Sequence, residues 1–393
     1  MDTKARRPDA SALVHGAAWR AASLASRVAF LALVVPRTIP GEYGLFFSYS
    51  SIGLLLSRVM SFGAIDHLPT WVKGDRARML RAARDFAPLS ALATAATAVA
   101  VASQGLLVSA LALALSMASG LMLAGAIRSV GPAWFERWLN LHPLLLLGIA
   151  LLLGEGVAAK ELLICQSVAI LISQLILLRF VSTSELALRA PDLRAWLRRV
   201  KAMLRGGHSR MVSDALMIGC IRGVAIGPVL FGVGAVSDSM ALALALGEAG
   251  WTVGMILVHR NFSYYCSSGP DVRHSARSAT MLLVAMAAAG VVGIGLALAI
   301  GSSPIIQRME LPSLLAAFAL FAGISALSEF RYFDVASGKP LLVWVFGQTA
   351  FLALAVSSPY VLGELGSVSL LAWLTVVGSV SLIARRWQSN LHL

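Results

Sequence analysis

The sequence predicts an all-α polytopic membrane protein with about twelve transmembrane helices in two six-helix lobes, and with both termini in the cytoplasm. Composition, the length of the apolar blocks and the placement of basic residues predict this. Of 393 residues, 58% are hydrophobic and 13% are charged, and the mean hydropathy is +0.80. Soluble domains lie far from these values. The apolar blocks run to about 17 to 25 residues, the length with which a helix crosses about 30 Å of hydrocarbon while bonding all its own backbone groups.

The apolar blocks between charged or Gly/Pro breaks give the individual spans. In the first half of the chain we expect spans at 13–35, 41–65, 86–102, 106–127, 135–153 and 159–180. In the second half we expect them at 211–232, 238–258, 278–300, 313–332, 341–358 and 365–384.

The basic residues orient these spans. Lys and Arg in short loops favour the cytoplasmic side. With the N-terminus inside, the loops and ends on that side contain 24 Lys and Arg residues, and the opposite loops contain three, Arg37, Lys160 and Arg308. Both termini are therefore expected in the cytoplasm, and the even number of spans agrees with this.

The longest loop divides the chain into three parts. We expect an N-terminal lobe at 1–183, a basic cytoplasmic amphipathic linker at 184–210 and a C-terminal lobe at 211–393. Within the linker, PDLRAWLRRVKAMLRGG predicts a surface helix that Asp192 can cap and Gly206 can end. Its apolar and basic faces are opposed, which favours binding to anionic lipid, and a solvated linker helix is the alternative.

Several classes of function lack their sequence signals. The net charge of +13 comes from basic residues in loops between apolar blocks, so no nucleic-acid partner is expected. The seven histidines and three cysteines form no metal-ligand spacing, and no phosphate-binding glycine motif follows a predicted strand. We expect no catalytic residue, no cofactor and no metal, and a transporter in place of an enzyme.

Four arginines stand out inside predicted spans, Arg20, Arg27, Arg58 and Arg222. Each costs about 2.5 to 3.5 kcal/mol at the bilayer centre, so such residues usually face a partner or a water-filled cavity. Arg20 and Arg27 are seven residues apart, nearly two turns, and share one stripe of their helix.

Three of the four have structural alternatives. Arg20 can extend to the headgroups, and Arg58 can reach the headgroups or Asp66. Arg222 and Glu248 each lie 13 residues from a turn centred near 235, so they can form an ion pair between adjacent helices.

Arg27 is more central, and the first two spans contain no acidic residue at its depth. We therefore expect a cationic cavity in which Arg27 binds an anionic substrate, with Arg20, Arg58 and Arg222 extending the lining. A guanidinium group binds phosphate or carboxylate through two parallel hydrogen bonds, and low dielectric strengthens that contact. Glu248 is the candidate for coupling to an ion gradient.

Two stretches resemble a known family. SRVAFLALVVPRTIPGEYGLFFSYSSIGLLLSRVMSFGAIDHLP, at 26–69, is similar to the opening of bacterial polysaccharide-repeat flippases of the Wzx type, and GEYGLF is its most specific part. IRSVGPAWFERW, at 127–138, adds to the likeness. These flippases belong to the multidrug/oligosaccharidyl-lipid/polysaccharide exporter superfamily.

The resemblance implies a flippase in the bacterial inner membrane that moves undecaprenyl-diphosphate-linked oligosaccharide by alternating access, for O-antigen, capsule or exopolysaccharide synthesis. Membrane lipids are expected partners, and a polysaccharide polymerase and glycosyltransferases are candidate ones. The alternatives are a polytopic enzyme of glycan assembly, such as an acyltransferase or polymerase, and a multidrug exporter of the same superfamily.

Overall fold

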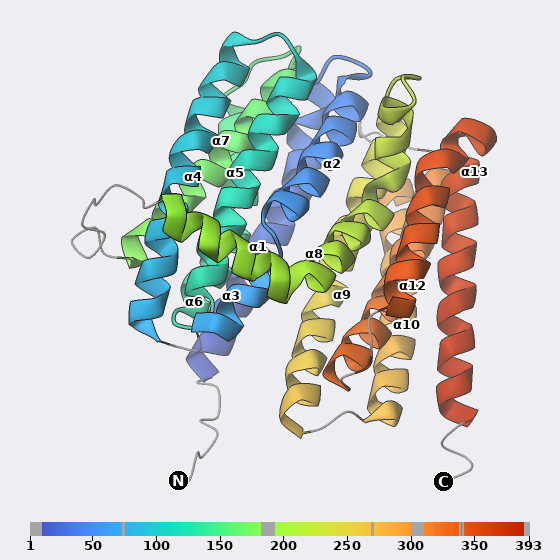
Figure 1. Cartoon of the computed structure of the whole chain (residues 1–393). Helices are drawn as coiled ribbons and strands as arrows, with labels where there is room; N and C mark the ends of the chain where they lie inside the picture. The colour runs from blue at the N-terminus through green and yellow to red at the C-terminus, as the bar shows by residue number, and fades with distance from the viewer. Residues whose placement is uncertain are drawn as a thin grey trace. The chain divides into compact units, whose positions relative to one another are not determined.

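The computed structural model describes residues 10–72, 75–181, 193–268, 271–299, 310–337, 339 and 342–388, and this part of the chain is helical with no β-strand (Figure 1). The helices are α1 (Ala10–Leu33), η1 (Val35–Arg37), α2 (Glu42–Met60), α3 (Ala64–Val72), α4 (Arg76–Ala102), α5 (Leu106–Ile127), α6 (Pro132–Leu151), α7 (Ala159–Phe180), α8 (Leu193–Leu230), α9 (Asp238–Ser268), α10 (Val272–Ala299), α12 (Leu311–Ala336) and α13 (Leu342–Gln388).

Seven of the described helical segments are long and apolar enough to cross a membrane. They are Ala18–Arg37, Arg76–Ala102, Leu106–Ile127, Ala159–Phe180, Met211–Leu230, Leu311–Asp334 and Leu342–Gln388. The described part of the chain is thus all-helical and has several helices that are typical of a multi-pass membrane protein, as the sequence predicts. Each of the twelve predicted spans also consists mainly of helical residues, with 41–65 divided between α2 and α3. The number that crosses and the side of the termini stay predictions.

The chain forms two compact units. Unit 1 comprises Met1–Arg37 and Ile52–Met211, and unit 2 comprises Thr38–Ser51 and Val212–Leu393. Two helices, α2 and α8, therefore contribute residues to both units. Residues 38–51, which belong to the N-terminal lobe in the sequence-based division, pack with unit 2.

Unit 1 is built around α5, which packs against α3, α4 and α7, while α6 packs against α1 and α7. Small residues bring these helices close together. A Cβ atom on Gly120 would lie 2.6 Å from the Trp138 ring, and one on Gly125 would lie 2.5 Å from the backbone oxygen of Ala64. Small residues at such positions allow the close packing that holds membrane helices together.

Three helices of unit 1 begin with a residue that favours a helix start. The Asp75 carboxylate accepts from the backbone N–H groups of Ala77 and Arg78, at 2.8 and 3.2 Å, and so starts α4. Pro132 occupies the first turn of α6, where its missing N–H costs nothing. Glu161, in the first turn of α7, accepts from the Ala158 N–H at 2.9 Å.

Unit 2 is built around α12, which packs against α9, α10 and α13. Its contact with α13 depends on Gly323, where a Cβ atom would lie 2.4 Å from the Thr375 hydroxyl. A stripe of glycines on α8, at 219, 223 and 227, lies against 352, 355 and 356 of α13. This spacing of small residues by four is a common packing motif of membrane helices.

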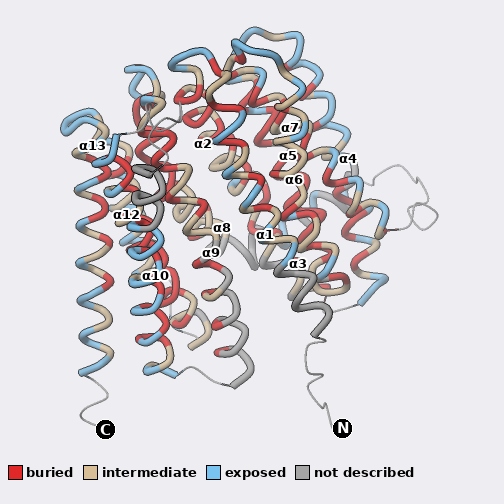
Figure 2. The backbone as a smooth tube through the Cα atoms, turned by 180° about the vertical axis from the view of Figure 1, so that it is seen from behind, coloured by how far each residue is buried: buried red, intermediate tan, exposed pale blue. Residues whose placement is uncertain are grey.

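α13 consists of two limbs that double back at Gly363, as Figure 1 shows. Gly363 has φ +71°, a left-handed conformation that glycine adopts without steric cost. The limbs correspond to the spans predicted at 341–358 and 365–384. Along the C-terminal limb, buried and exposed residues alternate (Figure 2), as expected for a helix with one packed face.

The linker helix differs from the prediction at its end. Gly206 does not stop it, because α8 runs without interruption from Leu193 to Leu230. A glycine inside a helix costs only about 1 kcal/mol relative to alanine, which the long flanking helical segments can outweigh. Residues 184–192 of the predicted linker, including Asp192, lie outside the described residues.

Candidate functional site

The first candidate group is the stripe of arginines on α1, in unit 1. The guanidinium of Arg20 meets the Glu136 carboxylate of α6 in a two-pronged ion pair, with Nε–Oε2 at 3.0 Å and Nη2–Oε1 at 2.5 Å. Asn140 donates to the Glu136 backbone oxygen at 2.8 Å and lies 3.4 Å from Oε2. The two charged side chains are 30% and 26% exposed. Arg20 therefore binds an acidic residue across two helices, an arrangement that the sequence did not predict.

Arg27 lies two turns further along α1, on a half-buried part of the helix. Ser23 and Ser26 on the same helix are buried, and the Ser26 hydroxyl donates to the Ser23 backbone oxygen at 2.8 Å. Unit 1 thus places Arg20 and Arg27 along one face of α1, with the Glu136 carboxylate of α6 beside Arg20.

Segment 127–138, which resembles the flippase family, contains the partner of Arg20 and two arginines that stack on aromatic rings. The guanidinium of Arg128 lies 5.0 Å from the centre of the Phe135 ring, and that of Arg137 lies 4.8 Å from the Trp134 ring. Cations stack favourably on aromatic faces at such distances. Glu136, between them in sequence, is the partner of Arg20.

The second candidate group is the Arg222–Glu248 ion pair in unit 2, which the sequence predicts as a structural alternative and which the structure contains. Arg222 on α8 is 9% exposed. It donates from Nη1 to the Ser51 hydroxyl at 3.2 Å, and its guanidinium lies 4.4 Å from the centre of the Phe47 ring. The buried charge is thereby met by a carboxylate, a hydroxyl and an aromatic face.

Arg58, the fourth arginine, is half-buried near the end of α2. Within the described part of the chain it forms no ion pair. The side chain of Asp66, its proposed partner, lies outside the described residues. Of the predicted residues, the structure therefore pairs Arg222 with Glu248 in unit 2, while Arg20 and Arg27 share helix α1 in unit 1.

Two further polar clusters of unit 2 were not predicted. In the first, Arg331 on α12 is 5% exposed. It donates to the Ser213 hydroxyl at 3.0 Å and to the Asp214 carboxylate at 3.1 Å, both on α8. Ser213 in turn donates to the Gln348 side chain at 3.1 Å, so the cluster joins α8, α12 and α13. Arg331 lies at the end of the span predicted at 313–332.

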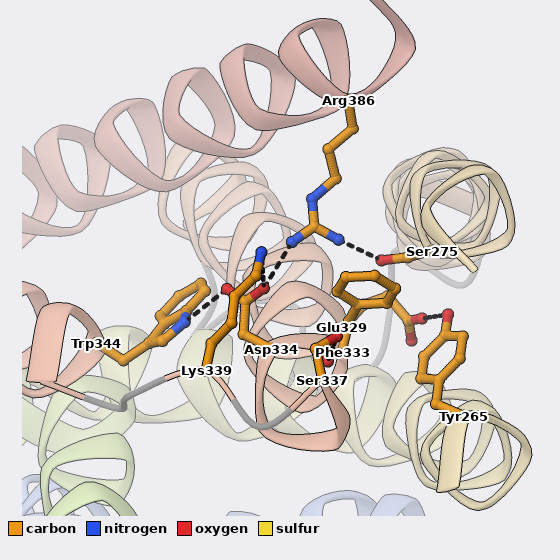
Figure 3. Close-up of polar contacts among 9 residues, drawn as sticks. All are labelled: Tyr265, Ser275, Glu329, Phe333, Asp334, Ser337, Lys339, Trp344 and Arg386. Atoms are coloured by element: carbon orange, nitrogen blue, oxygen red, sulfur yellow. Dashed lines mark hydrogen bonds and ion pairs between the residues drawn. The ribbon is translucent and has the colours of Figure 1, made fainter. Parts of the chain in front are cut away.

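The second unpredicted cluster surrounds the C-terminal half of α12 (Figure 3). Arg386 on α13 binds the Asp334 carboxylate at 3.1 Å and the Ser275 hydroxyl at 3.0 Å, and so connects α10, α12 and α13. Fully buried Glu329 accepts from the Tyr265 hydroxyl of α9.

Glu329 and Asp334, five residues apart in SEFRYFD, are the sequence feature that could have indicated this cluster. Acidic residues at the end of an apolar block suggest buried partners. Their satisfied hydrogen bonds favour a structural role, because buried polar groups in membrane proteins usually bond between helices.

The comparisons with known proteins do not assign the chain to a family. No family model matches the chain, and no curated protein matches it. Among solved structures, the chain is similar to the crystal structure of the eukaryotic MATE transporter AtDTX14, with 12% sequence identity and a TM-score of 0.40, over 95% of each chain. That TM-score is too low to support an inference about fold or function.

Proposed function

We propose that this protein is a flippase that moves lipid-linked oligosaccharides with an anionic diphosphate across the membrane. The observation that carries the proposal is the pair of guanidinium groups, Arg20 and Arg27, on one stripe of a helix long and apolar enough to span the bilayer. Seven residues correspond to about 10 Å along a helix axis. Two basic groups at this spacing give a diphosphate successive binding positions along its path.

The two arginines have different roles in this proposal. Arg20 is held by Glu136, so an anion binds there only in competition with a carboxylate. Arg27, half-buried on the same face of α1, is the principal contact for the diphosphate. Guanidinium binds phosphate bidentately, and the surrounding low dielectric strengthens each bond.

The Arg222–Glu248 pair extends the proposal to unit 2. Within the pair, the carboxylate neutralises a guanidinium that is almost fully buried. Protonation of Glu248, or binding of a cation to it, would release Arg222 toward an anionic substrate. Glu248 is accordingly the candidate residue for coupling transport to an ion gradient, and Arg58 adds basic charge on α2.

Reconstituted protein tests the proposal. We would measure movement of a fluorescent polyprenyl-diphosphate glycan between leaflets of liposomes, using a membrane-impermeant quencher. Arg27→Ala should slow movement by about 10- to 100-fold, the equivalent of the 1.5 to 3 kcal/mol that hydrogen bonds to charged groups contribute. Arg27→Lys should retain part of the activity, since lysine keeps the positive charge but cannot form the two parallel hydrogen bonds of a guanidinium group.

Arg37→Ala is the matched control, because Arg37 follows the same helix and lies 3.8 Å from Glu155, with side chains 36% and 82% exposed. It should behave as wild type. Equal rates for Arg27→Ala and wild type would refute the role of Arg27. If a neutral glycolipid moves as fast as the diphosphate, or if cells lacking the protein accumulate cationic dyes, the multidrug-exporter alternative replaces the flippase.

A further inference from the structure

The helix α2 changes its packing partners in the middle. Its residues up to Ser51 belong to unit 2, and those from Ile52 onward belong to unit 1. The helix itself is continuous from Glu42 to Met60. One continuous helix therefore has residues in both units, and the contacts on each side of residue 51 show how each half is held.

The start of α2 is capped by a carboxylate from a distant part of the chain. Asp238, the first residue of α9, accepts from the backbone N–H groups of Gly41 and Gly44, each at 2.8 Å. This carboxylate satisfies N–H groups that have no partner inside their own helix, and its charge complements the helix dipole. A Cβ atom on Gly44 would lie 1.9 Å from the backbone oxygen of Val236, so the two backbones are in direct contact.

A second anchor lies two turns along the helix. The buried guanidinium of Arg222 binds the Ser51 hydroxyl and stacks on the Phe47 ring, and the Ser48 hydroxyl accepts from the Val236 N–H at 3.3 Å. Phe47 and Ser48 are 4% and 0% exposed. The first half of α2 is thus fixed in unit 2 by polar bonds at both ends and by aromatic burial between them.

Immediately beyond Ser51 the contacts change to unit 1. A Cβ atom on Gly53 would lie 2.9 Å from the backbone oxygen of Ala110, in α5. The local sequence SYSSIG is poor in strong helix formers, and the Ser51 hydroxyl donates to the Phe47 backbone oxygen at 2.6 Å. Such back-bonding by serine and the presence of glycine both weaken a helix and favour bending.

From these contacts we propose that α2 is jointed at Ser51–Gly53. Its first half is a fixed part of unit 2, anchored by Asp238 and Arg222, and its second half moves with unit 1. Any movement between the units then bends α2 at this joint, and the GEYG turn stays docked throughout. The inference concerns how the chain couples its two units, and it is independent of the solute transported.

Distances between spin labels on the full-length protein in nanodiscs test the joint. The native cysteines are replaced by serine, and one label is placed at exposed Val380 on α13 of unit 2. The second label is placed either at Leu45, in the first half of α2, or at exposed Val59, in the second half. We expect one narrow distance distribution for the Leu45 pair and a distribution at least about twice as wide, or two peaks, for the Val59 pair.

Variants of the cap provide the second measurement. Asp238→Ala should broaden the Leu45 distribution and leave the Val59 distribution unchanged, because it frees only the anchored end. Gly44→Ala, whose added Cβ would collide with the Val236 backbone, should do the same if Asp238→Ala does not insert. Equal widths for the two wild-type pairs would refute the joint, and a Leu45 distribution that neither variant changes would refute the anchor.

Discussion

The ion pair between Arg222 and Glu248 gives the sharpest prediction about stability. Replacing Arg222 with Met leaves the Glu248 carboxylate without its partner in a region where the two side chains are only 11% and 16% exposed. Replacing Glu248 with Met leaves the guanidinium charge in the same position. In each case a mostly buried charge loses its counter-charge.

The structure sets the size of the effect. Removing one member of a buried pair typically costs about 3 to 5 kcal/mol. Arg222 keeps the Ser51 hydroxyl and the Phe47 ring when Glu248 is lost, so we take the lower end, about 3 kcal/mol, for Glu248→Met. This corresponds to about a hundredfold change in the ratio of folded to unfolded protein. Replacing both residues with Met removes both charges and should cost less than either single change.

The assay is a double-mutant cycle on the free energy of unfolding, measured by detergent titration of purified protein with tryptophan fluorescence as the signal. The control cycle uses the exposed pair Arg37 and Glu155, whose contribution should stay below about 1 kcal/mol. The reasoning fails if the double variant at 222 and 248 is as unstable as the sum of the two single ones. That result would mean that the charges do not interact and that the observed contact contributes nothing.

Two further predictions concern helix packing in each unit. In unit 2, Gly323→Ala should cost about 1 to 3 kcal/mol in unfolding free energy, because the new Cβ would lie within 3 Å of Thr375. Gly347→Ala, where a Cβ meets open space, should not destabilise, and equal losses for the two would contradict this packing. In unit 1, Gln174→Leu should cost about 1 to 3 kcal/mol, because it removes the 2.7 Å bond from the Gln174 amide to the Ser116 backbone oxygen. An unchanged unfolding curve for Gln174→Leu would show that water or another side chain takes over this bond.

The helices themselves could be predicted from the sequence because their cause is local. Within hydrocarbon every backbone group bonds inside its own segment, so a long apolar block specifies a helix without reference to other parts of the chain. Each predicted span accordingly consists mainly of helical residues. Helix ends were harder. Span 41–65 is divided by residues 61–63, where Phe62 and Gly63 have positive φ, so that α3 starts separately at Ala64.

Within the candidate site, the sequence could predict an ion pair only where it joins two helices that are consecutive in the chain. Arg222 and Glu248 lie on consecutive helices at equal distance from one turn, so counting residues was enough to pair them. The Arg20–Glu136 pair joins residues 116 apart in sequence, on helices whose contact only the tertiary structure establishes. The same limitation hid the Arg331–Asp214 pair, which joins α12 to α8.

The GEYG turn shows how a motif can be recognised before its cause is known. The sequence marks Gly41 and Gly44 as a specific feature but supplies no reason for glycine at the second of these positions. The reason lies 192 residues away (236 minus 44), where the Val236 backbone approaches so closely that no side chain fits.

The neighbouring Asp238 then completes the helix start that these glycines leave without a side-chain cap. The close contact with the Val236 backbone requires glycine at 44. The Asp238 carboxylate beside it accepts from the N–H groups of Gly41 and Gly44. Substituting Gly44 and Asp238 together should therefore destabilise the start of α2 little more than either change alone, since both remove the same docked state.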